Sequence, residues 1–203
     1  MSVKPILFNT EMVRAILDGK KTCTRRIVKG AIPDDAMWGY TMFTPKGCVS
    51  CRGVYADEYG EKFFRLPYQQ GDILYVRETW CKGSWMNEKE RYYYKADDND
   101  FHCVWHPSIH MPKEAARIWL KVTDVRVERL QDIDGKGCVK EGIEEEPLKD
   151  VGDEFVKGMF HDLWDSTIKK SDIDRYGWDA NPWVWVIEFE RCEKPKEERK
   201  WQN

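Results

Sequence analysis

The 203-residue sequence contains no hydrophobic run long enough to cross a membrane, and residues 1–10 hold one basic residue beside a short apolar stretch. Such a segment is too weakly basic and apolar for a secretory signal, so we predict a cytoplasmic protein without a membrane partner. No glycine-rich phosphate-binding loop follows a predicted strand, which argues against a nucleoside triphosphatase or a Rossmann dehydrogenase. No internal repeat is present, and the length is usual for a single domain.

Cysteine lacks the spacing of a disulfide framework. The seven cysteines are an odd number, and in a reducing compartment we expect them to remain thiols, so we predict no disulfide. Cys48 and Cys51 are three apart, as in half of a zinc site, but no second pair with this spacing occurs. We therefore interpret them as two thiols on a hairpin, expect no metal or other cofactor, and keep this pair as the candidate metal ligands.

The charge balance gives little general attraction for nucleic acid, because the net charge is −3. Phosphate binding would need a local basic cluster, and one follows residue 19, made of Lys20, Lys21, Arg25, Arg26 and Lys29. Ten tryptophans are the other unusual feature. A tryptophan ring is placed where it is buried or stacked, and we predict that most of these rings pack in the core.

Local patterns predict a mixed α+β fold. A short strand at residues 5–8 is followed by Asn9 or Thr10, which can cap a helix that runs to residue 18 and ends at Gly19. The polar stretch from residue 20 to residue 26 then begins a strand. Further strands are predicted at residues 51–55, 62–66, 73–80, 91–95, 118–128 with one bulge, and 182–191, with a helix at 153–168. We expect residues 91–95 to pair with 73–80, and the scattered antiparallel strands indicate an α+β barrel rather than a doubly wound sheet.

The stretch ILDGKKTCTRR at residues 16–26 resembles the helix-to-strand signature of ASCH domains, which belong to the PUA-like superfamily. The segments GDILYVRETW at 71–80, VRVERLQDI at 125–133 and NPWVWVIEF at 181–189, together with a Glu-Gly pair at 141–142, reinforce the resemblance. The likeness is strongest to the larger ASCH proteins of phages and prophages. It covers residues 1–192, with insertions at about 31–70 and 84–116, and leaves 193–203 as a charged tail.

The resemblance implies a small mixed β-barrel of about six strands flanked by helices, with a cleft suited to a nucleoside or single-stranded RNA. Some ASCH proteins remove the acetyl group of N4-acetylcytidine, others are reported as single-strand ribonucleases, and binding without catalysis is the third alternative. The catalytic lysine, threonine and glutamate of the deacetylating members match Lys21, Thr24 and Glu141 here. In that reaction Lys21, with a pKa lowered by burial and by the neighbouring Arg25, would deprotonate Thr24, and Glu141 would pass the proton to the leaving amine.

Several further residues are candidates for contacts with the substrate. Arg25 and Arg26 follow the catalytic positions, while Arg77, Glu78 and Trp80 mark a predicted strand end near the cleft, where Glu78 could take the role of Glu141. The main alternative is that Lys21, Thr24 and the two arginines form a solvated face whose cations complement the end of a helix. A binding module would instead use Arg25 and Arg26 with exposed rings such as Trp38 and Trp85.

Overall fold

The computed structural model describes residues 2–53, 60–84, 89–97, 103–144, 149 and 151–195. Strand β1 (Val3–Leu7) leads into helix α1 (Thr10–Leu17), which Asn9 caps by accepting a 2.8 Å hydrogen bond from the Met12 backbone N–H. The helix buries Val13 and Ile16, and the chain leaves it through Gly19 at φ +74°, a conformation that favours glycine. Strand β2 (Cys23–Ile27) follows at once, so the predicted helix-to-strand passage is confirmed.

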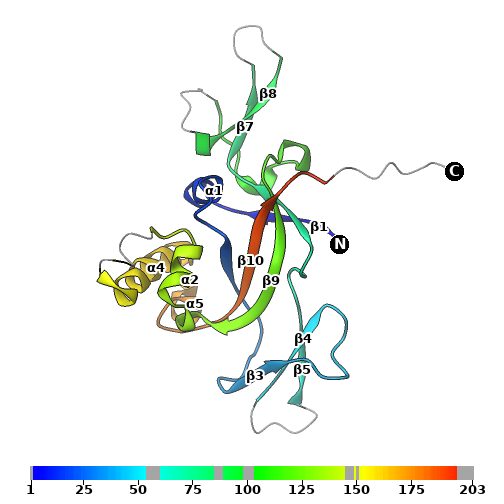
Figure 1. The fold of residues 1–203 in the computed structure, drawn as a ribbon, viewed down its shortest axis with the longest axis vertical. Helices are drawn as coiled ribbons and strands as arrows, with labels where there is room; N and C mark the ends of the chain where they lie inside the picture. Colours follow the sequence, from blue (N-terminus) through cyan, green and yellow to red (C-terminus); the bar gives the residue numbers. More distant parts are fainter. Residues whose placement is uncertain are drawn as a thin grey trace, which may run out of the picture.

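The central sheet has five strands in the order β1-β6-β9-β10-β2. Strand β6 (Ile73–Arg77) pairs in parallel with β1, while β9 (Trp119–Arg129) and β10 (Trp183–Cys192) form the long antiparallel pair visible in Figure 1. The register of that pair shifts between Glu188 and Phe189, which leaves one extra residue in β9 and confirms the predicted bulge. Because β10 hydrogen-bonds to β9 on one side and to β2 on the other, it is central, as its continuous apolar pattern indicates.

The sheet is open rather than the predicted closed barrel. Strands β1 and β2 are its two edges, and no ladder joins them in the described part of the chain. The Arg26 guanidinium bridges these edges instead, because its Nη2 donates to the Leu7 carbonyl at 3.0 Å. Strand β1 ends at Leu7 and Asn9 already caps α1, so the chain turns away before a ladder with β2 can form. The mixed α+β class is confirmed, whereas the barrel is not.

The two segments that the sequence analysis interprets as insertions extend from opposite ends of this sheet (Figure 1). The first contains three antiparallel strands, β3 (Ala36–Gly39), β4 (Cys48–Gly53) and β5 (Lys62–Arg65), where the sequence predicted only two; residues 54–55 of one predicted strand lie outside the described residues. In the second, β8 (Arg91–Tyr94) pairs with β7 (Trp80–Gly83) and not with β6. The predicted pairing with residues 73–80 therefore holds only at its end, where Trp80 pairs with Tyr94 and the Lys95 N–H donates to the Thr79 carbonyl. It is wrong for β6, because the strand ends at Arg77 and a new hairpin begins at Trp80.

The helices after β9 cover one side of β2 and β10 (Figure 1). They are α2 (Gly135–Lys140), α4 (Asp153–Thr167) and α5 (Ile173–Tyr176). A second core forms there around Val156, Phe160 and Trp164, in contact with Cys23. Short 3₁₀ helices occur at Lys95–Asp97, Ser108–His110, Lys113–Ala115, Leu130–Asp132 and Lys170–Asp172. Among the described helices, none has the length and apolar character needed to span a membrane.

One disulfide corrects the prediction that all cysteines remain thiols. Cys81 in β7 is bonded to Cys103, with an Sγ–Sγ distance of 2.17 Å. The two residues are 22 apart in sequence, and only the folding of the second insertion brings their Cα atoms to 6.4 Å, so spacing alone could not reveal the pair. Cys48 and Cys51 are free thiols of β4, and no group of three or more potential metal ligands is found within the described residues.

Candidate functional site

The candidate site lies where the segment between α1 and β2 contacts the C-terminal end of α2. The Thr22 backbone N–H donates to the Lys140 carbonyl at 2.9 Å, which holds the two segments together. Glu141 is the C-cap residue of α2, and the next residue, Gly142, has φ +101°. A Cβ atom at Gly142 would lie 3.1 Å from the Ala15 side chain, so a larger residue would push α2 away from α1. The Glu-Gly pair therefore places an acid against β2 by close approach of the backbone.

Lys21, Arg25 and Glu141 form a buried cluster of charge. Lys21 Nζ lies 2.6 Å from Glu141 Oε2 and 2.8 Å from the Glu141 carbonyl oxygen, while Arg25 Nη1 lies 3.2 Å from Glu141 Oε1. Lys21 and Glu141 are 2% and 4% exposed, although they are 120 residues apart in the sequence. The structure thus brings together the predicted lysine and glutamate, and the alternative of a solvated face at Lys21 is wrong.

Burial sets the proton affinities in this cluster. Desolvation lowers the pKa of Lys21 from its ordinary value of 10.5, against the opposing effect of the Glu141 carboxylate. The Glu141 carboxylate forms ion pairs with both Lys21 and Arg25, so when Lys21 loses its proton Glu141 remains paired with Arg25. Burial raises the pKa of the neighbouring Cys23 thiol to about 12, which disfavours a thiolate nucleophile at that position.

Thr24 supplies a hydroxyl without a partner. Its side chain is 1% exposed, and Oγ1 has no hydrogen bond to any described residue. A buried hydroxyl that forms no hydrogen bond costs about 1–3 kcal/mol. Among the described residues, four other buried side-chain nitrogens also lack a partner: those of Trp38, Trp80 and Trp183 and the Nε of Arg25. No hydrogen bond joins Lys21 to Thr24 in this structure. Arg25 and Glu141 line the same cavity as the hydroxyl, whereas Lys21 does not line it.

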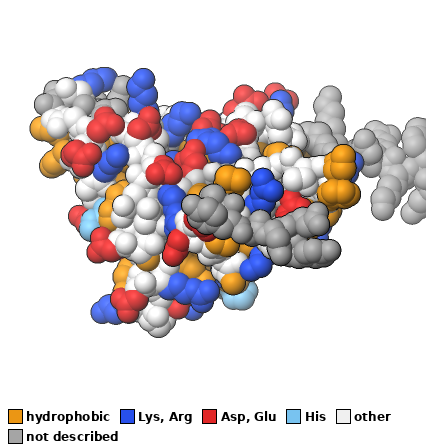
Figure 2. All heavy atoms as spheres, turned by 90° about the horizontal axis from the view of Figure 1, so that it is seen from below, with side chains coloured by type: hydrophobic (Ala, Val, Ile, Leu, Met, Phe, Trp, Pro, Cys, Tyr) orange, Lys and Arg blue, Asp and Glu red, His pale blue; other side chains and the backbone are white. Residues whose placement is uncertain are grey.

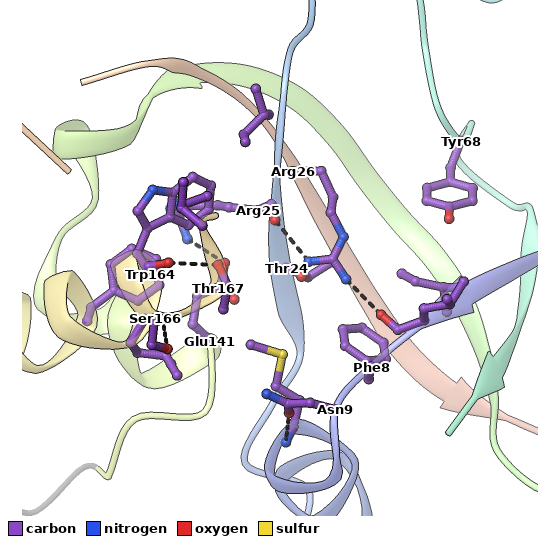
Figure 3. A pocket seen from close by; sticks show the side chains of 17 residues that line it. Phe8, Asn9, Thr24, Arg25, Arg26, Tyr68, Glu141, Trp164, Ser166 and Thr167 are labelled. Carbon is purple, nitrogen blue, oxygen red and sulfur yellow. Dashed lines mark hydrogen bonds and ion pairs between the residues drawn. The ribbon is translucent and has the colours of Figure 1, made fainter. Parts of the chain in front are cut away.

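The cavity lies along the free edge of β2, with a volume of about 620 Å³ (Figure 3). Thr24, Arg25 and Arg26 of β2 line it together with Glu141. One wall comes from α4 and contains Phe160, Trp164 and Thr167, and the opposite wall contains Phe8, Asn9 and Tyr68. The volume suits a nucleoside, since pockets for small molecules have volumes of about 300–1,000 Å³ and combine apolar walls with a few polar groups.

Three predicted contact residues lie elsewhere and do not line this cavity. Both carboxylate oxygens of Glu78 accept hydrogen bonds from Arg117 at 2.9 Å. Arg77 donates to the carbonyls of Met111 and Ile109, and the Trp80 ring packs against Tyr92 and His106. The strand end at β6 therefore anchors the second insertion, and the expectation that Glu78 faces the cleft is not met.

The tryptophans mostly pack, as predicted. Trp119, Trp164 and Trp185 are buried, and Trp38 is half-buried with its ring 5.1 Å from Phe64 and 5.6 Å from Trp183. Trp38 is therefore not the exposed stacking ring that a binding module would use, while Trp85 lies outside the described residues. The surface seen from below carries acidic and basic side chains interspersed (Figure 2). Any attraction for phosphate on that face is local.

Sequence reasoning missed the wall contributed by α4. The amphipathic pattern at residues 153–168 predicted a helix with one apolar face, and Phe160 and Trp164 of that face do pack in the second core, but they also line the cavity. Ser166 and Thr167 join them at the end of the helix, where their hydroxyls donate to backbone carbonyls one turn earlier. The periodicity of apolar residues shows which face of a helix is apolar, but it does not show that part of that face borders a cavity instead of packing against other residues.

Comparison with solved structures finds the crystal structure of an ASCH domain from Lactobacillus crispatus JV V101. The two share 11% sequence identity and superpose with a TM-score of 0.38, covering 94% of this chain and 79% of the other. No protein-family model matches the chain. No curated protein matches its sequence. The function must therefore be argued from the geometry of the cavity and its polar groups.

Proposed function

We propose that this protein is an ASCH-like amidohydrolase that removes the acyl group from N4-acylated cytidine, carried by a nucleoside or by single-stranded RNA. One observation carries the proposal: the buried, unpartnered Thr24 hydroxyl lines a nucleoside-sized cavity beside the Lys21–Glu141 pair. Amide hydrolysis needs a nucleophile, a base and a group that protonates the leaving amine, and these three residue types supply them.

In the proposed reaction Thr24 Oγ1 attacks the acyl carbonyl carbon while its proton passes to the neutral Lys21 amine. The C–N4 bond then breaks, and Glu141 passes the proton from Lys21 to N4, so that cytidine leaves with its amino group restored. Water attacks the resulting threonine ester, releases the carboxylic acid and returns the hydroxyl to Thr24. The lowered pKa of Lys21 supports its role as the base, because a larger fraction of the amine is neutral at a given pH.

Binding without catalysis is the second candidate, and one feature favours it. The Lys21 amine hydrogen-bonds to Glu141 and does not contact Thr24, so proton transfer requires a rearrangement when substrate binds. In a binding module the same cavity would hold a base between its aromatic walls. The ribonuclease alternative has less support, since no described histidine lines the cavity.

Acetate release from N4-acetylcytidine, followed by NMR, separates these functions. The wild-type protein should release acetate and cytidine, whereas retention of unchanged N4-acetylcytidine would indicate binding alone and shortening of an RNA would indicate a nuclease. The matched variant is Thr24→Val, which replaces the hydroxyl by a methyl group of similar size. It should lose activity while its stability stays equal or rises, because the hydroxyl has no hydrogen bond to lose. Full activity in Thr24→Val would reject the nucleophile.

A further inference from the structure

The two arginines of β2 are used differently. Consecutive residues of a strand point to opposite faces, so the side chains of Arg25 and Arg26 diverge. Arg25 is committed to acids, because its two terminal nitrogens lie 3.2 Å from Glu141 and 3.5 Å from Glu128. Arg26 donates only to backbone carbonyls, those of Arg25 at 3.1 Å and Leu7 at 3.0 Å, and it forms no ion pair with a described carboxylate. Both line the cavity.

Arg26 therefore retains binding capacity on the cavity side. A guanidinium has five N–H donors, of which the two carbonyls occupy two. The group is partly buried against the Phe8 ring, whose centroid lies 5.3 Å from the guanidinium carbon, and burial lowers the pKa of Arg26. The Glu141 carboxylate opposes this effect of burial but forms no ion pair with Arg26. A desolvated cation without an ion-pair partner is unfavourable, and an anion bound beside it would reduce that cost.

The balance of charges around the cavity also favours an anionic ligand. Glu141 lines the cavity and faces both Lys21 and Arg25. The Glu128 carboxylate, which also contacts Arg25, is shared with Arg126 at 2.5 Å. The Arg26 charge is thus left in excess at the cavity, although the whole chain has a net charge of −3. This local excess favours an anionic ligand over a neutral one.

The position of Arg26 indicates which part of a ligand carries that charge. Thr24 and Arg26 are two residues apart on β2, so both point to one side of the strand about 7 Å apart. In Figure 3 the side chains of Thr24 and Arg26 lie on the same side of β2, and the Arg26 guanidinium faces Phe8. A ligand whose reacting group meets Thr24 would extend its other end to the guanidinium.

We infer that Arg26 binds a phosphate group of the ligand, so that the cavity prefers a cytidine nucleotide, free or within RNA, to the neutral nucleoside. The identity of the base rests on the proposed function, whereas recognition of phosphate by Arg26 does not require hydrolysis. An arginine side chain suits this role because its planar donors match phosphate oxygens.

Calorimetric titration with cytidine, cytidine 5′-monophosphate, cytidine 3′-monophosphate and a short oligocytidylate tests the inference without chemistry. The wild-type protein should bind at least one phosphorylated ligand about tenfold tighter than cytidine, as expected for a charge-assisted hydrogen bond. The two monophosphates and the oligomer distinguish a terminal phosphate from a phosphodiester. Equal binding of cytidine and every phosphorylated ligand would overturn the inference, and this comparison needs no variant.

Two variants assign the effect to Arg26. Arg26→Gln should reduce the preference for phosphate to less than about twofold. Arg129→Gln is the control, since Arg129 also donates to two backbone carbonyls, those of Asn181 and Asp34, and stacks on Trp183, but does not line the cavity. Unlike Arg26, it has a carboxylate nearby, that of Asp34 at 3.7 Å. It should keep the wild-type preference. An unchanged preference in Arg26→Gln would overturn the inference.

The outcomes for the inference and for the proposed function differ. Hydrolysis of N4-acetylcytidine without any preference for phosphorylated ligands would leave the proposed function standing and reject phosphate binding. Preference for a cytidine nucleotide without acetate release would support phosphate binding and reject the amidohydrolase. If Arg26→Gln lowered the rate on acetylated nucleoside and nucleotide equally and left the binding preference intact, Arg26 would stabilise the transition state instead, and the inference would fail.

Discussion

Glu141 and Glu78 are both buried glutamates paired with cations, yet their surroundings differ. Glu78 is 1% exposed, and Arg117 occupies both of its oxygens. Glu141 is 4% exposed, is shared by Lys21 and Arg25, and lines a cavity of about 620 Å³. Glu78 shares its one cation, Arg117, with Asp97, whose Oδ1 lies 2.6 Å from the guanidinium, whereas Glu141 has two cations for one charge.

The difference lies in what surrounds each pair rather than in burial. Burial dominates the pKa at both sites, since it raises the pKa of Glu78 and lowers the pKa of Lys21. Within the described residues, only the Glu141 region combines such a pair with an unpartnered hydroxyl and a cavity. A buried ion pair is thus weak evidence for function, and the unsatisfied group beside it is the stronger indication.

The largest expected effect is on turnover. Lys21→Met should lower kcat/KM for N4-acetylcytidine by about 10³-fold, because it removes the base while Arg25 still neutralises Glu141. Glu78→Gln is the control at the other buried glutamate and should stay within about threefold of wild type when assayed as folded protein. Equal losses in the two variants would erase the distinction between the sites.

The next effect is on stability and has the opposite pattern. Arg117→Met should lower the free energy of unfolding by about 3–5 kcal/mol, since it leaves the Glu78 charge buried without its cation. Lys21→Met should cost less than half of that in the same urea titration. Adding Glu78→Leu to Arg117→Met should recover most of the loss, and a failure to recover would mean that packing rather than charge is responsible.

The disulfide offers a smaller effect in the region of Glu78. Replacing Cys81 and Cys103 by serine removes a cross-link between residues 22 apart in the sequence. The greater entropy of the unfolded chain should lower the free energy of unfolding by up to about 3 kcal/mol. The thermal midpoint should fall, while calorimetric binding of cytidine 5′-monophosphate at the cavity should not change. Loss of binding would show that the second insertion and the cavity are coupled.

The smallest effect concerns a third buried carboxylate, Asp72. Burial raises its pKa, but hydrogen bonds from Lys4, Ser2 and the Gln69 backbone outweigh burial and lower the pKa from 3.8 to about 2. A lowered pKa in the folded state contributes stability that is complete above about pH 4 and is lost as the pH falls toward 2. Urea titrations at pH 5 and pH 2.5 should show wild type losing up to about 2 kcal/mol more than Asp72→Asn. Parallel losses would contradict this assignment.

Local patterns predicted much of the fold. The cap at Asn9, the stop at Gly19, the bulged strand β9 and the central strand β10 all follow from residues close in sequence. Strand β3 was missed because Ala36–Gly39 has no alternation of apolar and polar residues. The open sheet and the Cys81–Cys103 bond were also missed, since both depend on which distant segments meet.

The site shows the same division. The resemblance to ASCH domains predicted that Lys21 and Glu141 belong to one site. The close contact of Gly142 with α1 gives the physical reason why the two side chains meet. The role of Glu78 was mistaken because its partner, Arg117, lies 39 residues away and nothing local indicates the pairing. The contribution of α4 to the cavity could not be predicted, because a sequence pattern identifies an apolar helix face but does not show whether that face is fully packed or borders a cavity.

The position of β2 at the edge of the sheet has a consequence for biosynthesis. Its ladder partner is β10, so the strand that carries Thr24 gains its backbone hydrogen bonds only when residues 184–188 are available. During translation residues 23–27 therefore cannot form this ladder until residues 184–188 have emerged from the ribosome. Chains that stop before β10 would contain every residue of the proposed cluster and still lack the scaffold that arranges it.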